Sequence, residues 1–231
     1  IEYTIVSKNQ LINMIENDDD LTVVCTSKIT NMIQLFSGNT SFNQDIGNWD
    51  VSNVTEMHGM FVSNHSFNQS LNNWDVSNVI DMSSMFSYNY SFNQPLNNWD
   101  VGSVYNMTFM FHGAESFNQP IGNWDVSNVN NMAFMFSHYL NTLSFNQDIS
   151  LWDVSNVTSM TRMFWSNNSF NQPIGDWDVS NVTNMSFMFA GKLCSTDDND
   201  SDPYNDWDCS ILPIFNQPIG NWDVSNVTDM R

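Results

Sequence analysis

Apolar and polar positions recur along this chain with a period of about 25 residues. Seven units begin with Phe-Asn-Gln and continue to a Trp-Asp pair, and successive units start 25, 25, 25, 28, 25 and 45 residues apart. The units start at Phe42, Phe67, Phe92, Phe117, Phe145, Phe170 and Phe215. A fixed period of this length indicates structural units that stack and bury a shared core. The chain is therefore predicted to form one elongated repeat array.

The second half of each unit has the apolar spacing of a short helix. Residues 54–61 carry apolar side chains at their first, fourth, seventh and eighth positions, which one side of a helix would share. Asn53 precedes this run and Glu56 follows three residues later, in the arrangement of a capping box. A helix of about two turns is unstable alone, so stacking must hold it in place.

The first half of each unit, residues 42–51 in the first full one, fits neither a clean strand nor a helix. Four units have Pro before their Ile or Leu, so that position cannot be a required backbone donor. We expect a short parallel strand near Phe-Asn-Gln, with neighbouring strands about 4.8 Å apart. The predicted fold class is an α/β solenoid, a stack of about eight 25-residue coils, each a short parallel strand plus a short helix.

Residues 1–20 do not match the repeat and are expected to form an N-terminal cap that covers the end of the core. Residues 1–6 are typical of a strand, and Ser7 precedes an apolar-periodic segment that predicts a helix. The repeat region spans 21–231, with an irregular acidic insertion at 190–214. Because the chain begins without Met and stops within a unit, we expect a processed or partial piece of a longer protein.

The net charge of the chain argues against nucleic acid and anionic lipid as partners. The chain has 5 basic and 25 acidic residues and a net charge of −20, which repels nucleic acid and anionic lipid. No run of 18 apolar residues is present, so no membrane-inserted helix is expected in this segment.

The unit Trp-Asp-Val-Ser-Asn-Val-Thr-x-Met-x-x-Met-Phe resembles a bacterial surface protein repeat of about 25 residues. This BspA-like family, also noted in mycoplasma lipoproteins, is a divergent leucine-rich repeat, and the match at 180–185 is quite specific. The resemblance covers 21–231 and implies a leucine-rich-repeat-like solenoid outside the cell or on its surface, with adhesion or host contact as its role. Relatives in large DNA viruses imply the virion surface as an alternative. Trp and Phe stand here where Leu is common, and the family implies no catalytic residues.

An aspartate follows each repeated Trp and could form a line of Ca²⁺ sites, since Ca²⁺ takes carboxylate oxygens. These residues are Asp50, Asp75, Asp100, Asp125, Asp153, Asp178 and Asp223. The alternative is that each carboxylate accepts hydrogen bonds from its own turn. We favour the alternative, because the Gly-rich nonapeptide of calcium-binding solenoids is absent.

The insertion offers a second metal candidate. Its aspartates match positions 1, 3, 5 and 9 of a calcium-binding loop: Asp198, Asp200, Asp202 and Asp206. Pro203 and Cys209 replace the expected Gly and Glu, so a solvated acidic loop is the preferred interpretation. Cys194 and Cys209 flank the insertion, and a disulfide between them and free thiols are equally compatible with the sequence.

Three other repeated columns are predicted to be structural. The Trp and Met columns could suggest a sugar platform or a soft-metal site, but a packed core explains them more simply. The Asn of Phe-Asn-Gln predicts a buried, hydrogen-bonded ladder between coils. Asn-x-Ser/Thr triplets in the variable segments are credible glycosylation acceptors, namely Asn39, Asn64, Asn89, Asn167 and Asn199.

Candidate binding residues lie where the units differ. One column contains Gly59, Ser84, Phe109, Phe134, Arg162 and Phe187. Its three phenylalanines form an apolar surface stripe or fold back onto the neighbouring coil. The variable segments add Tyr88, Tyr90 and Trp165. The four histidines fall at unequal repeat positions, and no catalytic motif is found.

The sequence therefore predicts a non-catalytic surface module that contacts a protein or a glycan through variable loops of a rigid array. A virion or envelope component and a carbohydrate-binding or carbohydrate-active solenoid are the alternatives. An exposed array end could also support end-to-end or lateral self-association.

Overall fold

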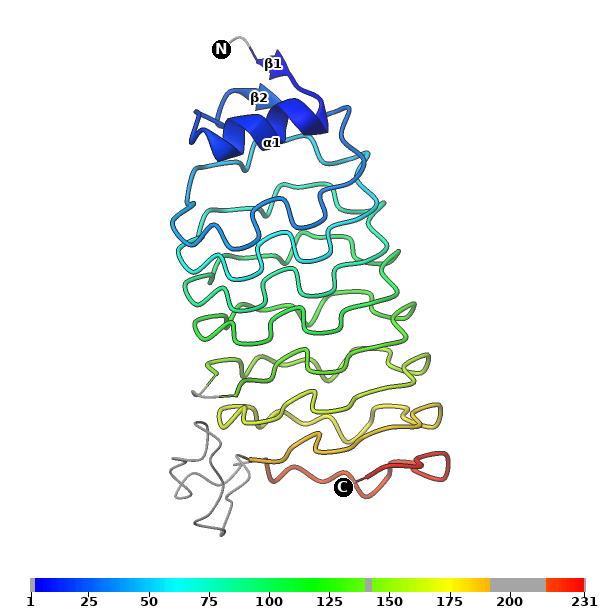
Figure 1. The fold of residues 1–231 in the computed structure, drawn as a ribbon. Helices are drawn as coiled ribbons and strands as arrows, with labels where there is room; N and C mark the ends of the chain where they lie inside the picture. Colours follow the sequence, from blue (N-terminus) through cyan, green and yellow to red (C-terminus); the bar gives the residue numbers. More distant parts are fainter. Residues whose placement is uncertain (1–2, 140–142, 192–214, 231) are drawn as a thin grey trace, which may run out of the picture.

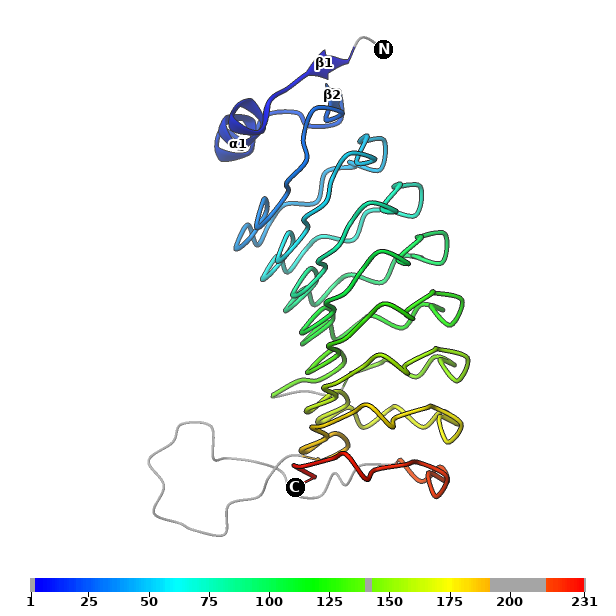
Figure 2. The same ribbon diagram turned by 90° about the vertical axis from the view of Figure 1, so that its right-hand side faces the viewer.

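The computed structural model describes residues 3–139, 143–191 and 215–230. Successive repeat units form successive coils that stack along one axis, with the N-terminal elements at one end and the last unit at the other (Figures 1 and 2). The chain is a repeat protein in which each coil contacts the coils before and after it. Within the described residues, no helix is long and apolar enough to cross a membrane.

The N-terminal end carries the regular elements of the described chain. Strand β1 (Thr4–Ile5) pairs in parallel with β2 (Val24–Cys25), and helix α1 (Lys8–Glu16) lies between them in sequence. Ser7 caps α1 in a reciprocal capping box with Gln10, with Ser7 N donating to Gln10 Oε1 over 2.9 Å. Leu11 is the fully buried residue of this helix and anchors it to the first coil.

The predicted helix and strand of each coil are both wrong. Within 54–61, residues 58–61 lie in consecutive turns, and Glu56 forms parallel bridges to the coils before and after it, whereas Phe-Asn-Gln forms none in the described coils. Alternate backbone N–H groups donate to the next coil, as Met57 N does to Asp81 O over 3.1 Å and Gly59 N to Ser83 O over 2.8 Å. The intervening groups close three-residue turns, as Met60 N does to Met57 O. The ends of such a turn lie three residues apart, as Met57 and Met60 do, and both are buried, so the apolar spacing is the same as on one side of a helix.

A left-handed residue in each coil excludes the helix directly. The column that contains Gly59 has φ between 52° and 60° in every described coil that includes this position. Its members are Gln34, Gly59, Ser84, Phe109, Phe134, Arg162 and Phe187. Side chains other than Gly cost roughly 1–2 kcal/mol in this region.

The core consists of three aromatic columns, with Met and Val between them. Neighbouring rings of the column that runs from Phe36 to Phe189 lie 5.5–5.8 Å apart, and those of the Phe42 column lie 5.8–6.2 Å apart. The Trp column is at most 4% exposed from Trp49 to Trp177. Each Trp Nε1–H donates to a carbonyl of an earlier coil, as Trp74 does to Ile46 O over 3.1 Å. The Trp column is therefore core, and it presents no sugar platform.

The repeated Asn forms the predicted ladder, although it is half-buried or exposed rather than buried. Asn93 Oδ1 accepts from Asn118 N and from Gln119 Nε2, each over 3.0 Å. The same pair of bonds recurs between the other coils. Side chains thus join the coils where a strand was expected, and a neighbouring Pro is tolerated there.

Candidate functional site

The left-handed column presents its side chains on one face of the stack. Phe109, Phe134, Arg162 and Phe187 occupy it in four successive coils, and all four are half-exposed. We call these four residues the stripe. The rings of Phe109 and Phe134 stack with centroids 4.4 Å apart and planes 12° apart. The stripe is thus a continuous surface feature whose side chains also pack along the stack axis.

Arg162 interrupts the phenylalanines with a cation. Its Cζ lies 5.5 Å from the Phe134 ring centroid and 5.1 Å from that of Phe187, at distances typical of cation–π contacts. It also lies 5.1 Å from the ring of Trp165, which is 7% exposed. The stripe therefore extends to Trp165 through Arg162.

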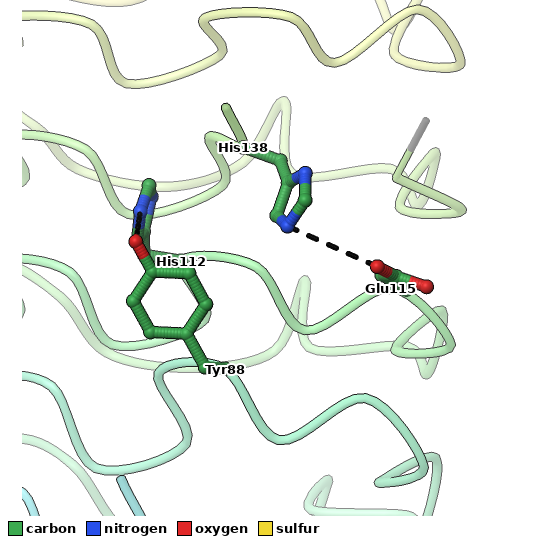
Figure 3. Close-up of polar contacts among 4 residues, drawn as sticks. All are labelled: Tyr88, His112, Glu115 and His138. Carbon is green, nitrogen blue, oxygen red and sulfur yellow. Dashed lines mark hydrogen bonds and ion pairs between the residues drawn. The ribbon is translucent and has the colours of Figure 1, made fainter. Parts of the chain in front are cut away.

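Beside the stripe, Tyr88, His112, Glu115 and His138 form a polar group that we call the His112 cluster (Figure 3). His112 Nε2 lies 3.0 Å from the Tyr88 hydroxyl, and His112 Nδ1 lies 2.7 Å from Ser137 Oγ. His138 Nε2 lies 3.9 Å from Glu115 Oε1. His112 also contacts Phe109 edge-on, with centroids 5.3 Å apart, so the cluster adjoins the stripe.

The hydrogen bonds of Ser137 determine the proton position on His112. Ser137 Oγ donates to Phe134 O over 2.9 Å, so His112 Nδ1–H must donate to Ser137 Oγ. His112 Nε2 then accepts from the Tyr88 hydroxyl. Burial, and secondarily the charge of His138, lower the pKa of His112 to about 3. A neutral imidazole with both nitrogens hydrogen-bonded links the coils that carry Tyr88, His112 and Ser137.

Gly113 makes room for the His112 cluster. It has φ of +70°, and a Cβ there would lie 2.9 Å from both Tyr88 Cδ1 and His138 Cδ2. The side chains of the coils before and after therefore fill the space beside this residue.

Most of the predicted binding residues are connected by these contacts. Tyr139 packs edge-on against both His112 and Trp165, with centroids 4.9 Å apart in each case, and so joins the cluster to the far end of the stripe. Tyr90 instead stacks on His65 at 4.5 Å. Sequence reasoning missed His112 and Tyr139, whose neighbours belong to other coils. Arg162 could have been found, because it is one of five basic residues and shares the phenylalanine column.

Each repeated Asp accepts hydrogen bonds from its own turn, as we favoured. Ser127 Oγ and Ser127 N donate to Asp125 Oδ1 over 2.6 and 3.1 Å, and the backbone bond recurs in every described coil of the column. The serine bonds lower the pKa of several of these carboxyl groups, Asp125 among them. Within the described part of the chain, no three His, Cys, Asp or Glu side chains are grouped to hold a metal ion.

The remaining predictions have mixed outcomes. Asn64, Asn89 and Asn167 are at most 5% exposed, because their side chains lie inside the coils. The prediction that they accept glycans is therefore wrong. Asn39 is half-buried. The predicted calcium loop, the predicted disulfide and Asn199 lie outside the described residues. The loop residues are Asp198, Asp200, Asp202 and Asp206, and the cysteines are Cys194 and Cys209.

One protein-family model matches the repeat units of the chain. The family model described as "Mycoplasma protein of unknown function, DUF285" matches residues 7–117, 71–141, 96–207 and 137–231. No curated protein and no solved structure matches the chain. Because the overlapping matches cover almost the whole sequence, the chain belongs to this family of mycoplasma repeat proteins of unknown function.

Proposed function

We propose that the chain is a non-catalytic interaction module, a leucine-rich-repeat-like solenoid of the BspA-like type that binds a partner at a cell surface. Its stripe is the contact face and its stacked coils are the rigid support. The partner is a protein or a glycan of another cell. Membership of a repeat family and the hydrogen bonds at both nitrogens of His112 are compatible with this role.

One observation carries the proposal, namely the occupancy of the left-handed column. Gly would adopt this backbone conformation without strain, yet one described coil has Gly at this position and three have Phe. Each Phe costs roughly 1–2 kcal/mol relative to Gly. The phenylalanines are half-exposed, so burial returns only part of that energy. A partner that covers them would explain their presence.

The test is adhesion of beads coated with the chain to cultured animal cells. The double variant Phe109→Ser, Phe134→Ser is expected to reduce the number of bound beads roughly tenfold, since hot-spot aromatics carry most binding energy. The matched control is Ile80→Ser, Tyr105→Ser, which removes two exposed apolar side chains of another column in adjacent coils. Circular dichroism verifies that each variant is folded.

Pretreating the cells separates the two partner classes. Loss of binding after protease treatment indicates a protein, and loss after glycosidase treatment indicates a glycan. Equal adhesion of the wild type and both double variants, or adhesion no greater than that of albumin-coated beads, would overturn the proposal.

A further inference from the structure

We infer that Arg162 is the centre of a carboxylate-binding site, and that its ligand is an acidic peptide segment of a protein partner. The inference rests on the proposed function and specifies the chemistry that the stripe recognises. The aromatic side chains orient the guanidinium, and its N–H groups bind the carboxylate oxygens.

The surroundings of Arg162 fix its position without using its donors. Phe134, Trp165 and Phe187 lie 5.1–5.5 Å from Cζ, so the guanidinium is held by rings. In the described part of the chain, its side chain makes no hydrogen bond or ion pair. A planar guanidinium in this state presents its fork of N–H groups to a carboxylate in the geometry of a bidentate pair.

The charge around Arg162 has an unusual distribution for so acidic a chain. The parallel-bridge column carries Glu56 and Asp81 in the early coils. In the coils around Arg162 it carries neutral residues instead, namely Asn131, Ser159 and Asn184. Among the described residues, Arg162 has no carboxylate within ion-pair distance, and the column carries a carboxylate again only at Asp229. An external carboxylate would complete the pair.

A second unpaired donor lies beside the guanidinium. Trp165 Nε1 is buried and has no hydrogen-bond partner among the described residues, although buried indole N–H groups usually have one. Its ring is also one of the three that hold Arg162. Because Nε1 is buried, a ligand oxygen at Arg162 reaches this N–H only when the side chains that cover it move.

Ring packing favours a peptide over an acidic sugar. Sugar sites use flat, free aromatic faces, whereas one face of Phe134 is covered by Phe109 at 4.4 Å and the ring also packs against Arg162. Phe187 likewise packs against Arg162. The half-exposed rings suit aliphatic side chains, so the expected ligand is an acidic residue flanked by apolar ones.

The test uses the two arginines of the chain, Arg162 and Arg231, in a nitrogen-15 NMR spectrum of arginine Nε–H groups. The probes are the capped tripeptides Leu-Glu-Leu and Leu-Gln-Leu, and sialyllactose as an acidic sugar. We expect the Glu peptide to shift the Arg162 signal, leave that of Arg231 in place and bind at least tenfold more tightly than the Gln peptide.

Variants complete the test. Arg162→Gln should abolish the difference between the two peptides, and Arg162→Lys should reduce it, because Lys cannot form the planar fork. Lys28→Gln removes the same charge from an exposed site in an early coil and should change nothing. Equal binding of both peptides, unchanged binding by Arg162→Gln, or a shift with sialyllactose alone would overturn the inference. Cell adhesion that depends on Phe109 and Phe134 would stand in those cases, so the two proposals fail separately.

Discussion

At the scale of single residues, the His112 cluster is organised around a histidine that stays neutral. Tyr88, Ser137, His138 and Tyr139 surround the ring of His112, and its two nitrogens already have partners. A proton would have to enter a buried site next to a second histidine. This arrangement couples the stability of the coils to pH.

We expect the free energy of unfolding to fall as pH falls from about 6.5 towards 3. The pKa of His112 is lowered to about 3 in the folded chain, so in that window only the unfolded chain binds the proton. The slope is at most about 1.4 kcal/mol per pH unit. Urea unfolding at pH 7, 6 and 5 measures it, above the range in which most carboxyl groups titrate. His112→Gln should flatten the dependence, whereas His65→Gln, which removes a half-exposed ring, should preserve it.

Gly113 permits a second residue-scale prediction with a matched control. Gly113→Ala introduces both left-handed strain and two contacts of 2.9 Å, and Gly38→Ala introduces only the strain, since nothing lies within 4 Å of its Cβ. We expect Gly38→Ala to destabilise by about 1 kcal/mol and Gly113→Ala by roughly 2–4 kcal/mol. Urea midpoints give both values. Equal losses would mean that Tyr88 and His138 move aside freely.

At the scale of elements, the sequence indicated the length of the stacking unit correctly but not the backbone conformation within it. The 25-residue period and the Trp column indicated stacked coils with an aromatic core, and Ser7 marked the start of α1. The helix predicted at 54–61 was wrong because the two ends of a turn, such as Met57 and Met60, have the same apolar spacing as one side of a helix. Gly59 is the member of the column whose residue type indicates a positive φ, whereas Phe109 and Arg162 do not, since Gly and Asn are the residues that favour it.

The Asn ladder leads to a prediction about the stability of Asn93 variants. Asn93→Ala removes the acceptor for Asn118 N and Gln119 Nε2, and it should destabilise by about 1–2 kcal/mol. Asn93→Asp keeps an acceptor oxygen at the same position and should be destabilised less. Thermal unfolding of the two variants beside the wild type decides this. If both variants are destabilised equally, the amide nitrogen or the local charge contributes more to stability than the acceptor oxygen does.

At the scale of the whole molecule, stacking determines which residues meet. Arg162 contacts Phe134 and Phe187 because each lies one coil away, and no local motif contains the three. The phenylalanine column could therefore be predicted from the sequence. The charges around Arg162 and the contacts of His112 could not, because they depend on neighbours in other coils. The same stacking aligns the aspartates along the axis and adds repulsion between coils.

That repulsion leads to the last prediction, on ions. Adjacent carboxylates one coil apart repel by about 0.9 kcal/mol even in water. Serine bonds keep Asp75, Asp125, Asp178 and Asp223 charged by lowering their pKa, so the repulsion persists to low pH. Added salt should therefore raise the unfolding midpoint by screening.

The measurement is thermal unfolding by circular dichroism in NaCl, MgCl₂ and CaCl₂ at matched ionic strength, with chelator as the reference. We expect Ca²⁺ to add no more than Mg²⁺, because the repeated carboxylates already accept bonds from their own turns. A saturable increase specific to Ca²⁺ would contradict this, since ligand at 100 times its Kd adds about 2.7 kcal/mol. Asp125→Asn would then test the column, and Asp198→Asn would test the insertion.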